Sequence, residues 1–300
     1  MVQRILVGLD GSPLAETVLP FVSDLAGAFN AEVRLAHVVH VSEDLPVGDR
    51  FPTKEALTER AKSQAQSYLE EVRGRLVRSG VNVGTTVLVG DAAAELVNLA
   101  QREHSDLIAI ATHGRSGLQH LLYGSVAEKV LHTATTPVLL ISPAGTQEAA
   151  PRKLTHVLVP LDGSPLAETV FPEALELAAG LHLPVVLLRV VEFPAYAVSD
   201  PSMGQYVDYG ELLDILTDNA KRYLNEVADR LRKEGATVTT ESPLGMPATE
   251  IAQHVHNYPG ALIVIATHGR TGLVGALLGS VARQVLRAQA PTVIVRPVGP

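Results

Sequence analysis

The sequence predicts an α/β protein of two tandem doubly wound domains, each a five-stranded parallel sheet with helices on both faces. First, the chain repeats itself, because the segment Leu9 to Val18 (LDGSPLAETV) is identical to Leu161 to Val170. Second, each half alternates short apolar runs with longer segments of helical apolar spacing, a pattern typical of a parallel sheet. The equivalent residues Asp10 and Asp162 are 152 positions apart. Since solenoid units are about 20–50 residues long, this repeat indicates a duplicated domain.

The elements of the first half follow from apolar runs and the residues that bound them. A run that ends at Asp10-Gly11 predicts the first strand, and a strand that is closed by Gly90 predicts the third. The continuous apolar run at 107–110 suits a strand buried on both sides. A Ser after a Gly, as at Ser125, is typical of a helix start. The predicted strands are 4–9, 32–39, 82–89, 106–112 and 138–141, and the predicted helices are 13–29, 54–79, 92–103 and 125–133.

The second half repeats this pattern, with the helix-two residues Tyr68 and Tyr223 at an offset of 155. A polar segment at 146–153 reads as a linker, so we expect domains at 1–146 and 154–300. Strand order 3-2-1-4-5 is chosen because it brings the loops after strands one and four to the point where the winding reverses. Ligands bind at that point in open sheets of this kind.

Composition narrows the class of protein. Of the 300 residues, 46% are hydrophobic and 19% charged, which is ordinary for a globular chain that fills a core. The net charge of −8 argues against a nucleic-acid partner. The absence of cysteine excludes disulfides and thiolate metal sites. No apolar stretch approaches the roughly 20 residues of a membrane span and no signal segment is evident, so we expect a soluble cytoplasmic protein without a membrane partner.

A glycine-bearing loop follows the fourth strand in each half and is the strongest functional signal. The first copy reads ATHGRSGL from Ala111, with Gly124-Ser125 downstream, and the second reads ATHGRTGL from Ala266, with Gly279-Ser280 downstream. A strand, a glycine-rich loop and a helix N-terminus together can bind phosphate through backbone N–H groups and the helix dipole. The glycines could also be ordinary turn residues, and the serines could be helix caps.

Asp10 and Asp162 end the first strand of each half. Such a carboxylate can accept hydrogen bonds from a ribose or help to hold a metal bound to phosphates, and the alternative is a helix cap. Their pairing with the strand-four loop in both halves favours a ligand. Glu16 and Glu168 are predicted to belong to a solvated helix face. His37 becomes Arg189 in the second copy, which argues against a shared catalytic histidine.

Catalytic signatures do not stand out. His113 and His268 have no repeated nucleophile and base around them, and the Walker motif and a G-x-G-x-x-G motif after strand one are absent. A nucleotide would therefore be held by the loop after strand four.

At these residues the sequence resembles the universal stress protein family, as a tandem two-domain member of its ATP-binding subgroup. The motif of that subgroup, G-x2-G-x9-G-[ST], maps onto Ala111, Gly114 and Gly124-Ser125, with alanine at the first glycine in both copies. The resemblance implies ATP as ligand, with Mg²⁺ left open, and pairing through the last strand. The two halves would then form an intramolecular pseudo-dimer, with a further homodimer as an option. The residues implied to bind nucleotide are Gly8, Asp10, Val38, Ile110, Ala111, Gly114, Gly124, Ser125 and Val126, and Pro160, Asp162, Val190, Ile265, Ala266, Gly269, Gly279, Ser280 and Val281.

The leading hypothesis is an ATP-binding regulatory stress-response protein with one nucleotide in each half, which acts through conformation or partner binding. One alternative is a slow ATPase or nucleotidyl-transfer enzyme. The other is a nucleotide-free interaction module.

Overall fold

The computed structural model of the chain describes residues 1–40, 53–112, 124–142, 153–192, 209–267, 278–288 and 290–297. It separates into two compact units. The first comprises Met1–Pro151 together with Pro291–Pro300, and the second comprises Arg152–Ala290.

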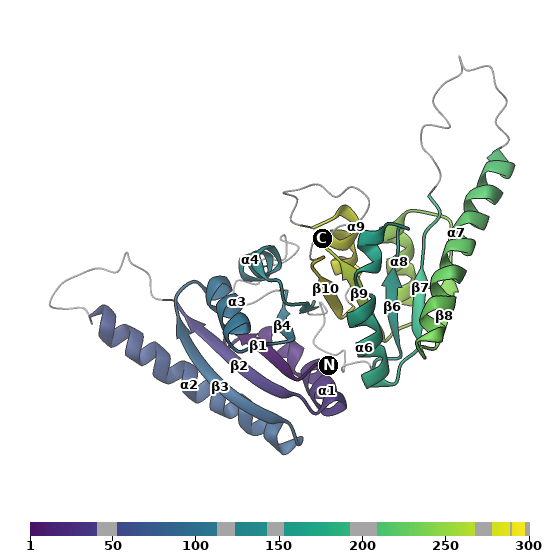
Figure 1. Cartoon of the computed structure of the whole chain (residues 1–300). Helices are drawn as coiled ribbons and strands as arrows, with labels where there is room; N and C mark the ends of the chain where they lie inside the picture. Colours follow the sequence, from purple (N-terminus) through teal and green to yellow (C-terminus); the bar gives the residue numbers. More distant parts are fainter. Residues whose placement is uncertain are drawn as a thin grey trace, which may run out of the picture. The chain divides into compact units, whose positions relative to one another are not determined.

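The first unit contains a parallel sheet in the predicted order. Its strands are β1 (Arg4–Leu9), β2 (Glu32–Val39), β3 (Asn82–Val89), β4 (Leu107–Ala111) and β5 (Val138–Ile141). They lie in the order β3-β2-β1-β4-β5. Figure 1 shows β1 between β2 and β4. The α/β class and the 3-2-1-4-5 order predicted for the first half are therefore confirmed.

Helices cover both faces of this sheet, α1 and α2 on one and α3 and α4 on the other (Figure 1). They are η1 (Ala15–Val18), α1 (Leu19–Phe29), α2 (Lys54–Arg78), α3 (Ala92–Arg102) and α4 (Ser125–Thr133). The sequence predicted one helix over 13–29, whereas the structure has a 3-10 turn followed by a helix from Leu19. Pro20 explains the difference, because it has no N–H to donate to the preceding turn.

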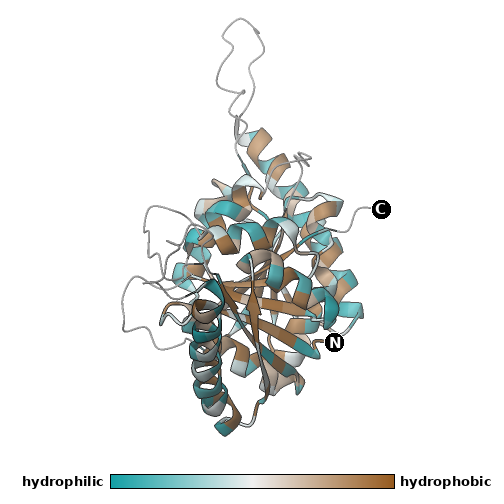
Figure 2. Cartoon of the chain, turned by 90° about the vertical axis from the view of Figure 1, so that its left-hand side faces the viewer, coloured by the Kyte–Doolittle hydropathy of each residue, from teal (hydrophilic) through white to brown (hydrophobic). Residues whose placement is uncertain are grey.

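The core consists of the strands and the inward stripes of the helices. Ile5, Leu6 and Val7 of β1 are wholly buried, as are Ile108 of β4 and Leu139 of β5. The strands accordingly appear brown and the helices striped in Figure 2. Burying one such side chain stabilises the fold by about 1.5–3 kcal/mol, so the central strands are rigid supports for the loops at their ends.

The second unit repeats this design. Its strands β6 (His156–Pro160), β7 (Val185–Leu188), β8 (Val238–Glu241) and β9 (Ala261–Ala266) are parallel in the order β8-β7-β6-β9. Its helices are α5 (Pro165–Glu168), α6 (Phe171–Leu181), α7 (Tyr209–Lys233), α8 (Pro247–Asn257), α9 (Ser280–Val285) and η3 (Leu286–Ala288). The break between α5 and α6 precedes Pro172, as the break before α1 precedes Pro20.

The last strand of the chain, β10 (Thr292–Val295), belongs to the first unit by its contacts. It pairs antiparallel with β5, with Thr292 opposite Leu140. Arg296, just beyond β10, donates to the carbonyl oxygen of His132 at 2.6 Å. A cation at the C-terminal end of α4 also interacts favourably with the helix dipole.

Across the described ranges, no helix joins the length and the apolar character that crossing a membrane requires.

Candidate functional site

The turn after β1 is built by two local side-chain bonds. Asp10 Oδ1 accepts from the N–H of Ser12 at 2.9 Å, and Ser12 Oγ accepts from the N–H of Ala15 at 3.1 Å. Gly11 between them has φ +83°, a left-handed conformation that favours glycine. Asp10 thus makes an Asx turn, and Ser12 makes the bond of the helix-capping type that was the alternative to a ligand role.

The second unit builds the same turn after β6. Ser164 N–H donates to Asp162 Oδ1 at 2.8 Å, Ser164 Oγ accepts from Ala167 N–H at 3.2 Å, and Gly163 has φ +85°. In each unit the turn holds one carboxylate at the carboxyl edge of the central strand.

The end of β4 is joined directly to the start of α4. Thr112 is 1% exposed, and its backbone carbonyl oxygen accepts a hydrogen bond from the N–H of Gly124 at 2.5 Å. The backbone N–H of Thr112 donates to the carbonyl oxygen of Ile141 at 2.8 Å. In the second unit Gly279 N–H donates to the carbonyl oxygen of Thr267 at 2.7 Å. These bonds place the first turn of the following helix at the carboxyl edge of the sheet.

Strand register brings the two turns together. In the first unit β1 pairs with β2 up to Leu9 opposite His37, and Val7 lies opposite Ala109 of β4. Following the strands onward, Asp10 lies level with Val38 on one side and Thr112 on the other.

The second unit has the same register. Pro160 lies opposite Leu188 of β7, and Leu158 lies opposite Ile263 of β9. Asp162 is therefore level with Val190 and Thr267. In each unit three features therefore share one edge of the sheet. They are the aspartate carboxylate, the end of the second strand and the start of the helix after the fourth strand.

Other predicted residues face the core. A methyl group at Gly8 would lie 2.9 Å from Ile110 Cγ2 and from Leu96 Cδ1. That space is therefore filled by packing against α3, and Ile110 itself is only 4% exposed. Contact of Gly8 or Ile110 with a ligand would have to use their backbone.

The remaining predicted residues are distributed as follows. Ser125 and Val126 are exposed, with Val126 38% exposed, and Ser280 is exposed beside the half-buried Val281. Ala111 is half-buried, and Ile265 and Ala266 are buried in β9. The predicted residues Gly114 and Gly269 lie outside the described residues, as do Gly117, Gly272, His113, His268, Arg115 and Arg270.

A cluster beside each turn was missed by the sequence reasoning. The carboxylate of Glu168, in α5, contacts two residues of α7. It accepts a hydrogen bond from Tyr223 Oη at 2.9 Å and forms an ion pair with Arg230. In the first unit Glu16 accepts from Arg75 at 2.6 Å. The side chains of Glu16 and Glu168 are only 23% and 24% exposed.

The prediction that these glutamates belong to a solvated face is therefore wrong. They join the first helical turn to the long helix α2 or α7, next to the aspartate turns. The signal was available, because Glu16, Tyr68 and Arg75 recur as Glu168, Tyr223 and Arg230. Burial, and then the neighbouring glutamate, raise the pKa of Tyr68 and Tyr223, so both phenols stay protonated.

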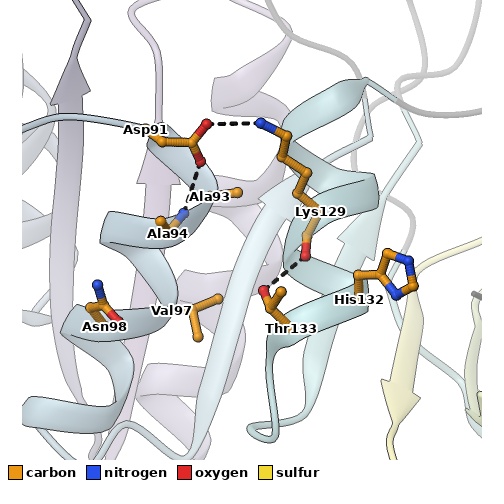
Figure 3. A pocket seen from close by; sticks show the side chains of 8 residues that line it. All are labelled: Asp91, Ala93, Ala94, Val97, Asn98, Lys129, His132 and Thr133. Carbon is orange, nitrogen blue, oxygen red and sulfur yellow. Dashed lines mark hydrogen bonds and ion pairs between the residues drawn. The ribbon is translucent and has the colours of Figure 1, made fainter.

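A hollow of about 310 Å³ lies elsewhere in the first unit, between α3 and α4 (Figure 3). Asp91 and Lys129 form an ion pair of 2.8 Å at this hollow, and Asp91 also caps α3 through the N–H of Ala94. The bond to Lys129 lowers the pKa of Asp91. Its lining contains none of the predicted nucleotide residues. It is lined by Asp91, Ala93, Ala94, Val97, Asn98, Lys129, His132 and Thr133.

Comparison with known proteins gives matches along the chain. The sequence model of the universal stress protein family matches residues 1–142 and 153–296. A universal stress protein of Mycolicibacterium smegmatis is 27% identical over 302 residues, which are 98% of this chain and 97% of that protein. Universal stress protein MJ0531 of Methanocaldococcus jannaschii is 34% identical over 141 residues, 46% of this chain and 81% of its own. A solved universal stress protein from Archaeoglobus fulgidus shares the fold, with a TM-score of 0.68, 18% identity and coverage of 99% of this chain and 97% of its own.

Proposed function

The chain belongs to the universal stress protein family, and from that premise we propose that it is an ATP-binding regulatory protein of the stress response, with one nucleotide site in each unit. The observation that carries the proposal is the repeated edge of the sheet. In both units an aspartate turn, the end of the second strand and the start of the helix after the fourth strand lie at the same level.

The phosphate end of the site is proposed at the first turn of α4. Gly124, the N-cap residue that precedes α4, has φ −66° and ψ 156°, and it makes no side-chain cap hydrogen bond within the described part of the chain. The first N–H groups of a helix have no partner within the helix, and with the dipole they favour an anion. The exposed Ser125 hydroxyl can donate to a phosphate oxygen. Gly279 and Ser280 supply the same arrangement in the second unit.

The base and ribose end is proposed at the aspartate turn. Asp10 and Asp162 can accept hydrogen bonds from ribose hydroxyls. The half-buried Val38 and Val190, level with them, offer apolar contact to a base. Val126, an exposed apolar side chain at the phosphate end, would lose contact with water when a ligand covers it.

Mg²⁺ fits only as a companion of the nucleotide. Among the residues that the structure describes, no group of three or more histidine, aspartate or glutamate side chains is placed to hold a metal ion. A Mg²⁺ ion would therefore be held mainly by phosphate oxygens and water, with Asp10 or Asp162 as its protein ligand.

The proposed assembly uses the last strands of the repeats. The antiparallel pairing of β10 with β5 supports an intramolecular pseudo-dimer of the two repeats. The domain limits 1–146 and 154–300, a further homodimer and a cytoplasmic location stay predictions.

Calorimetric titration with ATP tests the proposal. We expect two ATP molecules per chain in the wild type, one in Gly124→Val or Gly279→Val, and none in the double variant, because a valine side chain at the helix start obstructs the backbone N–H groups. A Cβ at Gly124 lies 3.4 Å from the carbonyl oxygen of Thr112 and so does not overlap the backbone. Gly27→Val is the matched control, on an exposed helix position with no atom within 4 Å.

Absence of heat and of any thermal shift in the wild type would reject nucleotide binding and favour the interaction module. Loss of binding in Gly27→Val as well would assign the effect to the fold rather than to the site.

A further inference from the structure

We propose that Arg189 gives the second unit's nucleotide site a positive charge that the first unit's site lacks, so that the second site binds highly charged nucleotides more tightly. The inference rests on the proposed function and deepens it, because it makes the two sites unequal.

Arg189 lies against the turn that carries the predicted nucleotide ligand. It directly follows β7 and precedes Val190. A methyl group at Gly163, the neighbour of Asp162, would lie 3.0 Å from Cζ of Arg189. The guanidinium group is therefore in van der Waals reach of the turn backbone after β6.

The ring of Tyr223 also contacts this guanidinium. Cζ of Arg189 lies 4.8 Å from the centroid of the Tyr223 ring, a cation–π distance. The backbone N–H of Arg189 donates to the carbonyl oxygen of Glu241 at 3.0 Å. Residue 189 is half-buried, so its charge is held close to the turn that carries Asp162.

The first unit has a histidine at the equivalent position. His37 is 8% exposed and packs edge-on against Tyr68, with ring centroids 5.9 Å apart. The tyrosine is thus retained in both units, while its partner changes from an imidazole to a guanidinium. A neutral imidazole adds no charge to the site.

The charged residues of the turn itself and of the helix cluster that contacts it correspond between the two units. Asp10, Glu16 and Arg75 correspond to Asp162, Glu168 and Arg230. Each set of three carries one net negative charge. With Arg189 the set in the second unit is neutral, whereas the first unit has at this position an imidazole, which carries no permanent charge.

The effect of this difference in site charge on binding affinity should depend on the charge of the nucleotide. ATP carries more negative charge than AMP because it has two further phosphoryl groups, so a fixed positive charge near the site favours ATP most. We expect ATP to bind the second unit about three- to tenfold more tightly than the first at low salt. Raising the ionic strength should shrink the ratio, since salt screens exposed charges.

The experiment reads each unit alone by calorimetry. The Gly124→Val variant reports the second site and Gly279→Val the first. Adding Arg189→His to Gly124→Val should weaken ATP about three- to tenfold and AMP less, with a smaller loss at high salt. Arg189→Lys keeps the charge and should retain most of the affinity. The matched control is Lys233→His, which replaces a lysine at the C-terminal end of α7 by histidine as well.

The outcomes separate the two proposals. If ATP binds Gly124→Val but Arg189→His changes its affinity by less than about twofold, or equally for ATP and AMP, the role of Arg189 is overturned and the proposed function stands. An effect of Lys233→His as large as that of Arg189→His would overturn it too. If ATP binds neither single-site variant nor the wild type, both proposals fail.

Discussion

Replacing Gly260 by alanine is expected to destabilise the second unit by about 3 kcal/mol. Gly260 precedes β9 with φ +101°, which is strained for any residue with a Cβ. A methyl group there would lie 2.5 Å from the carbonyl oxygen of Lys153 and 3.0 Å from the side chain of Thr155. Because the nearest atom belongs to the backbone, the entries to β6 and β9 would have to move apart. Urea unfolding followed by circular dichroism measures the loss.

Gly235→Ala separates strain from overlap. Gly235 has φ +93° in the same unit, but no atom lies within 4 Å of a Cβ built on it. It should cost only about 1 kcal/mol. Equal losses in the two variants would show that the contact with Lys153 costs nothing.

Removing the imidazole of His254 is expected to cost about 3 kcal/mol, the sum of an unpaired buried group and a cavity. His156 and His254 are 7% and 6% exposed, and their Nε2 atoms are 2.9 Å apart. His254 Nδ1 lies 2.8 Å from Glu241 Oε2, and His156 Nδ1 lies 3.0 Å from Thr155 Oγ1. The variant His254→Ala would leave His156 Nε2 unpaired, and urea unfolding at neutral pH measures the effect.

Glu241 and Thr155 lie at the two ends of this series of hydrogen bonds, and their chemistry determines which ring nitrogens carry the hydrogens. An ionised Glu241 only accepts, so His254 Nδ1 carries a hydrogen and, in the neutral ring, its Nε2 accepts from His156. His156 Nδ1 then accepts from the Thr155 hydroxyl. Every polar atom of the two rings is paired while both are neutral.

Acid should therefore destabilise the second unit. Burial, and then the neighbouring His254, lower the pKa of His156, while Glu241 opposes them. The unfolded chain then binds more protons than the folded one once the pH falls below about 6.5, the ordinary histidine value. The stabilisation is complete above that value and is lost as the pH falls from there through the lowered pKa of His156 in the folded state. The ring of Tyr258, the residue that follows α8, also packs against the pair, with its centroid 4.9 Å from that of His254.

Urea midpoints at about pH 7.5 and about pH 5.5 test this dependence. The control is the double variant His156→Leu, His254→Leu, which replaces both partners by apolar groups. The first unit already has Leu99 where the second has His254. An unchanged pH dependence in the double variant would contradict the assignment.

Much of the fold could be predicted because buried strands have a clear sequence pattern. The bounds predicted for β1, β2, β3 and β5 agree with the structure. β1 and β3 end at turn residues, and β5 lies between Pro137 and Pro143. The helix over 13–29 was predicted too long, because one apolar stripe runs through both η1 and α1 and hides the break at Pro20.

The site was less accessible to sequence reasoning. Its position at the sheet edge followed once the strand order was chosen, because parallel strands end at the same edge. The Glu16 cluster was missed because its bonds join residues about 60 positions apart on two helices, and helical spacing within one segment does not report them. The inward packing of Gly8 against Leu96 likewise depends on which face α3 covers.

The pairing of β10 with β5 has a consequence for synthesis. The segment that completes the first unit's sheet leaves the ribosome only after the whole second unit has been made. Until then the nascent first unit has an open strand edge at β5, and such edges readily pair with other chains. Chaperone protection, or rapid translation of the second unit, would therefore matter most during that interval.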